Sequence, residues 1–184
     1  SMEDKALVRR LFHAHSILPP TYRTRILNML SKSTVSATMS DDIMAVVKLN
    51  FSTQDQSSDA LAQSLQPKSA LEQTKLHTAA FQYLAWVARV GPSQEGFDIA
   101  VPLIDTMGGF IEGHGWPAPE KTSHDDIALR SKAYETIGVL ARSAEMPIER
   151  RLKLAGWLFK SLSEDPTTDA VVNIDGALSS LTTN

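Results

Sequence analysis

The chain has 184 residues, of which 42% are hydrophobic and 21% are charged, as is ordinary for a globular protein with a sizeable core. The net charge is only −3, the basic residues are scattered, and no apolar run approaches the roughly 20 residues of a membrane span. We therefore expect neither nucleic acid nor a membrane as a partner, and the lack of cysteine excludes disulfides and thiolate metal sites.

The first residues predict two consecutive helices, because apolar side chains recur at helical spacing and strand signals are nearly missing. The first helix has four apolar residues that step by four, three and four: Leu7, Leu11, Ala14 and Leu18. Pro19 and Pro20 end this helix and suit the first turn of the next. The second helix carries Tyr22, Ile26, Met29 and Leu30.

The middle of the chain predicts three more helices. The segment "SDDIMAVVKLNF" opens with Ser40 as a helix cap and two aspartates that complement the positive helix start. A short helix near "ALAQSLQ" is ended by Pro67. The strongest helix extends from Lys68 to Val90, where two adjacent apolar stripes predict packing on more than one side. One stripe contains Leu76, Ala80, Tyr83, Val87 and Val90, and the other Phe81, Leu84 and Ala88.

The remaining residues predict four helices and one long loop. A helix over "EGFDIAVPLIDTMGGFIEG", with Pro102 in its first turns, precedes a Gly/Pro-rich loop at 113–123. Ser123 caps a helix over "HDDIALRSKAYETIGVLARSA". The next helix, from about Pro147 to Ser163, has apolar residues in register at Ile148, Leu152, Ala155, Phe159 and Leu162. The last helix carries Val171, Ile174, Leu178 and Leu181.

Eight to nine helices with short connections imply antiparallel neighbours, which fits either a closed bundle or a row of stacked helical hairpins. The helix pairs are compatible with the roughly 40–47-residue period of HEAT and armadillo repeats, but the period alone does not decide. We expect an all-α stack with N-terminal hairpins over 3–112, the Gly/Pro-rich loop at 113–123, and C-terminal HEAT-like hairpins over 124–184 that continue the first part.

Three glycines favour the stack, which is an α-solenoid or α-α superhelix. Gly138, Gly156 and Gly176 lie inside three successive predicted helices, where each glycine costs about 1 kcal/mol relative to alanine. A missing side chain allows a neighbouring helix to approach closely, so close packing can offset that cost. The alternative is that three isolated glycines are simply tolerated.

The sequence offers poor material for catalysis. The pair His124–Asp125 is typical of all-helical metal-dependent phosphohydrolases, but its further ligands would have to come from His77, far upstream, or from His114 in the loop. The glycines around Gly108 match no phosphate-binding motif, and no nucleophile motif occurs. We therefore expect no enzyme, no cofactor and no metal, and keep the hydrolase as a remote alternative.

Partner contacts are the more promising interpretation, with tryptophans as the candidates, because tryptophan is enriched in binding hot spots. Trp116 lies in the proline-rich loop, whereas Trp86 and Trp157 share helix faces with charged residues. Each of the three is predicted either to contact a partner or to pack against an adjoining repeat.

The region from Leu129 to Leu181 resembles the proteasome adapter and scaffold protein family, whose members are very large HEAT-repeat proteins. The resemblance rests on "KAYETIGVLAR", "LFKSLSEDP" and "IDGALSSL", which occur in the family's order and spacing across three successive helices. The opening Ser1–Met2 is typical of an expression tag, so we expect this chain to be a fragment of such a protein.

The resemblance implies a non-catalytic scaffold of the cytoplasm and nucleus that binds proteasome subunits. It would bridge or stabilise the regulatory and core particles and support proteasome quality control or localisation. A helical-repeat adaptor of the armadillo or transport type, for another protein partner, is the alternative. That alternative requires a ladder of asparagines and tryptophans, which the sequence does not show.

Overall fold

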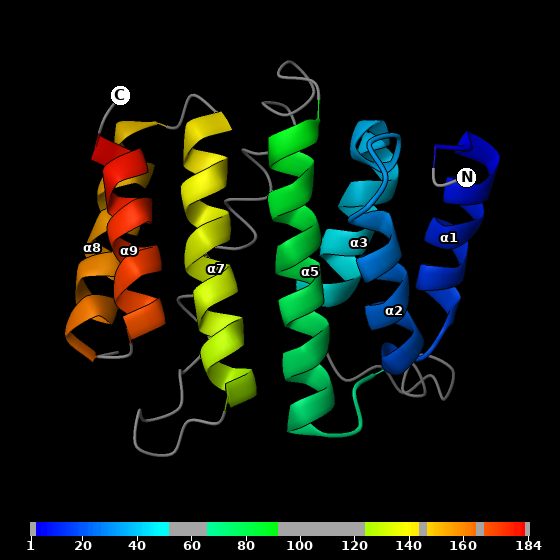
Figure 1. The fold of residues 1–184 in the computed structure, drawn as a ribbon, viewed down its shortest axis with the longest axis horizontal. Helices are drawn as coiled ribbons and strands as arrows, with labels where there is room; N and C mark the ends of the chain where they lie inside the picture. Colours follow the sequence, from blue (N-terminus) through cyan, green and yellow to red (C-terminus); the bar gives the residue numbers. More distant parts are fainter. Residues whose placement is uncertain (1–2, 52–65, 92–123, 144–146, 165–167, 183–184) are drawn as a thin grey trace.

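The computed structural model describes residues 3–51, 66–91, 124–143, 147–164 and 168–182, and these form an all-helical stack (Figure 1). Within these ranges there are seven α-helices, one short 3₁₀ helix and no strand. Their bounds are α1 Lys5–Ile17, α2 Pro20–Leu30, η1 Ser36–Thr38, α3 Ser40–Phe51, α5 Ala70–Val90, α7 His124–Ser143, α8 Ile148–Glu164 and α9 Thr168–Thr182. The predicted helices near "ALAQSLQ" and Pro102, the loop at 113–123 and the cap Ser123 lie outside the described residues.

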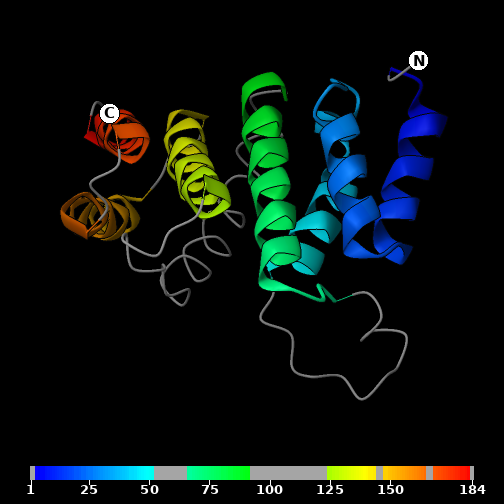
Figure 2. The ribbon, with the colours of Figure 1, turned by 60° about the horizontal axis from the view of Figure 1, so that its bottom comes forward.

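The helices form an open row. Helices α2, α5, α7 and α9 contact one another in that order, while α1 and α3 pack against one end of the row and α8 against the other. Figure 2 shows α8 and α9 one over the other, so the row has a second layer of helices. The predicted all-α fold is confirmed, and the open row agrees with stacked hairpins rather than a closed bundle. The HEAT repeat class stays a prediction.

Local sequence fixes where several helices begin. The carboxylate of Asp4 accepts a hydrogen bond from the amide of Ala6 at 2.9 Å and so caps α1. Pro20 occupies the first turn of α2, where a backbone amide has no acceptor within the helix, so the lack of an amide hydrogen in proline removes no hydrogen bond. At the start of α5, Ser69 accepts from the amide of Glu72 at 3.1 Å. The starts of α2 and α5 therefore lie close to the predicted positions.

The predicted apolar stripes are partly displaced in the structure. Both predicted stripes of α5 are buried or half-buried, as expected for a helix with neighbours on two sides. In α1, by contrast, the fully buried apolar residues are Val8 and Phe12, one position from the predicted stripe. In α8 four of the five residues of the predicted stripe are exposed, Ala155 packs partly against the core, and Leu154 and Leu158 are buried. The predicted apolar register of α8 therefore does not mark its buried face, because this helix carries two apolar faces.

The glycine prediction holds at one position of three. A Cβ built on Gly138 of α7 would lie 3.3 Å from the Cα of Ala177 in α9, so the two helices do approach closely there. Gly156 and Gly176 are exposed, and a Cβ on either would meet nothing within 4 Å. The predicted close packing is therefore wrong at these two positions.

A buried polar cluster joins four helices at the N-terminal end of the row. The side-chain oxygen of Asn50 in α3 accepts from Arg23 of α2 at 3.3 Å, and its amide nitrogen lies 3.0 Å from Nε2 of His15 in α1. His77 of α5 donates to the carbonyl of Asn50 at 2.9 Å, and its ring stacks on Phe51. Burial lowers the pKa of His15 to about 4, with a smaller effect from Arg23. His15 is therefore neutral and can accept from Asn50.

Candidate interaction surfaces

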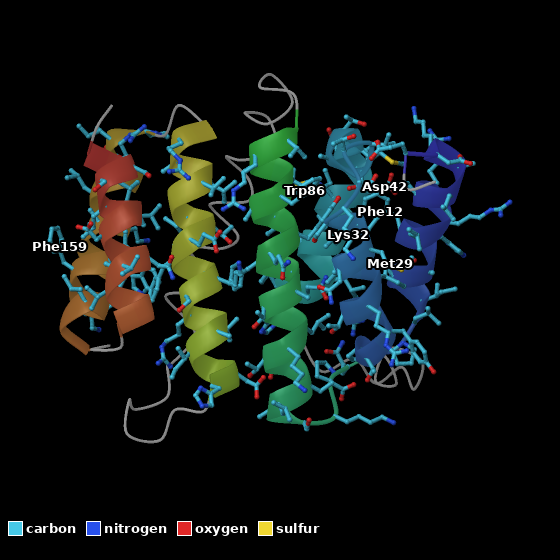
Figure 3. The ribbon with its side chains drawn as sticks, in the orientation of Figure 1. Phe12, Met29, Lys32, Asp42, Trp86 and Phe159 are labelled. Carbon is cyan, nitrogen blue, oxygen red and sulfur yellow. The ribbon has the colours of Figure 1, made fainter. Side chains whose placement is uncertain are left out.

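Among the described residues, the largest group of exposed apolar side chains lies on α8. Ile148, Leu152, Phe159 and Leu162 recur at helical spacing on one side of this helix, and we call them the outer stripe. Phe159 is 61% exposed and lies on the outer side of the α8–α9 pair (Figure 3). Helix α9 adds Val172, which is 65% exposed. Three of the four side chains of the outer stripe are more than 60% exposed within the described stack, so they are available to a partner.

The opposite end of the row is polar. Helix α1 exposes Lys5, Arg9, Arg10 and His13, and only Ile17 among its larger apolar side chains is more than half exposed. The α1 end therefore exposes fewer large apolar side chains than the α8–α9 end.

The two described tryptophans have intramolecular roles. The indole nitrogen of Trp86 donates to the carbonyl of Ser33 at 2.9 Å, and its ring packs against the core on the α2–α3 side of α5 (Figure 3). Trp157 is half-buried and packs on Tyr134 of α7, with the ring centroids 5.4 Å apart. Contact of either with a partner stays a prediction, and Trp116 lies outside the described residues.

The histidines are not gathered into a metal site in the part of the chain that the structure describes. His124 is exposed at the start of α7, whereas His77 is buried in the polar cluster of α5. No three His, Asp or Glu side chains among the described residues are placed to hold a metal ion. His114, the third residue of the hydrolase alternative, lies outside these ranges.

None of the helices that the structure describes is long and apolar enough to cross a membrane.

A groove of about 610 Å³ separates the first turn of α2 from the first turn of α5, and we call it the α2–α5 groove. Two large side chains in its walls, Tyr22 and Leu71, are 52% and 50% exposed. Three cationic side chains also line it: Arg25, Lys68 and Lys75. The groove thus combines apolar surface with positive charge in one concave site.

Glu72 connects the two walls of the α2–α5 groove. One of its carboxylate oxygens accepts from the backbone amide of Lys68 at 2.9 Å, and the other accepts from the hydroxyl of Thr21 at 3.0 Å. These interactions hold the pKa of Glu72 below its usual value, with the Lys68 amide as the largest cause. The carboxylate is therefore ionised and fixed in the wall, and it belongs to the framework of the groove.

Neither surface was predicted from the sequence. The outer stripe had a signal, because α8 carries one apolar set at Ile148, Leu152 and Phe159 and a second at Leu154 and Leu158, which is more than one buried face requires. The α2–α5 groove had none, because its two walls are separated by some 50 residues and meet only through tertiary packing of α2 on α5.

The open row of helices and its uncovered apolar side chains define an all-helical stack with exposed apolar surface. Comparison with known families is more specific: the family described as proteasome component ECM29, N-terminal, matches residues 1–184. The chain therefore belongs to this family, as the resemblance of its C-terminal helices predicted. Searches of curated proteins and of solved structures find no match.

Proposed function

We propose that this chain is part of a non-catalytic scaffold that binds the proteasome and bridges or stabilises its regulatory and core particles. The observation that carries the proposal is membership of a proteasome-component family over the whole chain. The same family supports the further proposals of a role in proteasome quality control or localisation, and of a cytoplasmic and nuclear location.

The stack suits a scaffold for a physical reason. In a row of helices each pair contacts only its neighbours, so the row can bend by small adjustments at each seam while it stays folded. In HEAT-type repeats, the class we propose here, successive pairs bury one another's apolar faces.

The outer stripe supports the scaffold proposal because it has the composition of a packing seam. Large apolar side chains on α8 are bordered by Gly156, and α9 exposes Gly176 on its own surface. At the α7–α9 seam inside the row, Gly138 already receives the backbone of Ala177 in this way. We propose that a further helix pair covers the outer stripe and extends the scaffold.

The bridging role is tested with purified regulatory and core particles mixed in the presence and absence of the chain. Native gel electrophoresis then separates the free particles from the joined ones. We expect the chain to migrate with the particles and to raise the joined fraction on dilution. A joined fraction that does not change at any chain concentration would contradict bridging.

A pair of variants tests the outer stripe in the same assay. The double variant Leu152→Asp, Phe159→Asp places two charges in the stripe, and Ile17→Asp places one at an exposed apolar position on the α1 end. If the stripe receives a helix pair of the scaffold rather than the particles, both variants migrate with the particles as the unmodified chain does. Loss of binding in the double variant alone would assign the stripe to the proteasome contact.

A further inference from the structure

The α2–α5 groove has a positive charge that its own walls do not neutralise. Arg25, Lys68 and Lys75 face a single carboxylate, Glu72, whose two oxygens are already engaged by the groove itself. Arg25 and Lys75 are exposed and form no ion pair with any residue that the structure describes. The chain as a whole carries a net charge of −3, so this local excess of cations is opposite in sign to the rest of the molecule.

The positive ends of two helices add to this field. The groove lies at the first turns of α2 and α5, and the amide groups of a helix start favour negative charge close by. At the start of α5, Ser69 and Glu72 accept from the amides of Glu72 and Lys68, so this helix start contributes through its dipole rather than through those two donors. An anionic ligand is therefore favoured by side chains and backbone together.

The apolar walls limit which anion fits. Tyr22 and Leu71 each leave about half of a large side chain in water, and Pro19 extends the same apolar surface. A small inorganic anion would leave this surface uncovered. A nucleic acid is favoured by a longer basic stripe with several aromatic side chains, and the groove has one aromatic residue. An acidic peptide with an apolar side chain uses both features.

We propose that the α2–α5 groove binds an acidic segment of a partner protein. Carboxylates of the segment would pair with Arg25, Lys68 and Lys75, and one of its apolar side chains would pack between Tyr22 and Leu71. The inference deepens the proposed function by naming the chemistry of one contact, and it rests on that function only for the partner being a protein.

The test uses fluorescence anisotropy with a short labelled peptide in which Asp and Glu residues flank a Leu-Phe pair. Two control peptides keep the length, one with Asn and Gln in place of the acids and one with Ser in place of Leu-Phe. We expect the first peptide to bind and each control to bind at least fivefold more weakly. Affinity should fall as salt is raised, since exposed charges supply part of the attraction.

Variants of the chain separate the groove from general attraction. Arg25→Glu with Lys75→Glu reverses two charges in the groove, and Arg9→Glu with Arg10→Glu makes the same change in net charge on the exposed side of α1. We expect the groove pair to weaken binding at least tenfold and the α1 pair less than twofold. Tyr22→Ser should weaken it severalfold. Circular dichroism checks that each variant keeps its helices.

Three results would overturn the inference. The first is equal weakening by the groove pair and the α1 pair, and the second is no anisotropy change with peptide at millimolar protein. The third is tighter binding of a single-stranded oligonucleotide of equal charge, which would assign the groove to nucleic acid. Because the probe is a synthetic peptide, each result is independent of the particle-bridging assay, so failure of the groove and failure of the proposed function are distinguishable.

Discussion

The same substitution at three helix glycines should have opposite effects, because only Gly138 lies in a seam between helices of the described stack. All three lie inside α-helices, and among the described residues no glycine has a positive φ, so alanine fits the backbone at each position. Helix propensity alone predicts a gain of about 1 kcal/mol in the free energy of unfolding for each Gly→Ala change.

At Gly156 and Gly176 nothing opposes that gain, since a Cβ there meets no atom within 4 Å. We therefore expect Gly156→Ala and Gly176→Ala each to stabilise the chain by about 1 kcal/mol. At Gly138 the new Cβ lies 3.3 Å from the Cα of Ala177, which is helix backbone and yields little. Overpacking of this kind costs about 1–3 kcal/mol, so Gly138→Ala should be neutral or destabilising by up to about 2 kcal/mol.

Urea unfolding followed by far-ultraviolet circular dichroism measures these differences, with the midpoint and slope fitted for each variant. Thermal unfolding provides a second measure, because 1 kcal/mol corresponds to a shift of roughly 2–4 °C for a domain of this size. If Gly138→Ala stabilised the chain as much as Gly156→Ala does, helices α7 and α9 would be less closely packed at Gly138 than described. That result would refute the predicted difference between the glycines.

Three more predictions concern the core and the surface. The pKa of His15 is lowered to about 4 by burial, so the folded state binds fewer protons than the unfolded one. The free energy of unfolding should therefore be highest above about pH 6.5 and fall by about 3 kcal/mol as the pH is lowered to 4. Melting curves of the chain and of His15→Gln check this, and equal pH slopes would contradict it. Leu158→Ala should lower the free energy of unfolding by about 2–5 kcal/mol because Leu158 is 0% exposed, whereas Phe159→Ala should change it by no more than about 0.5 kcal/mol. Equal urea midpoints for the two variants would contradict this contrast. Trp86→Phe should lower the free energy of unfolding by about 1 kcal/mol, because the hydrogen bond from the indole nitrogen to the carbonyl of Ser33 is lost. An unchanged melting temperature would argue against that bond.

The sequence predicted best what depends on local chemistry. The start of α2 follows Pro20 as predicted, because a proline at a helix start acts within a single turn. The long helix α5 was predicted with both of its apolar faces, since it has neighbours on two sides and leaves little ambiguity.

What failed depends on which elements meet in space. The buried face of α8 could not be chosen from sequence because the helix has two apolar faces, and only its packing against α9 and Tyr134 selects between them. A helical pattern also gives no reason to bury Arg23, which is 2% exposed and reaches Asn50 from another helix. The glycines show the same limit: spacing placed them in helices, but only Gly138 has a neighbour at its open side.

Sedimentation velocity of the fluorescently labelled chain, mixed with purified proteasome, measures directly whether the chain binds the proteasome. We expect part of the label to sediment with the proteasome and an excess of unlabelled chain to displace it. Label that sediments only as the free 20.1 kDa chain in every mixture would show that the chain does not bind.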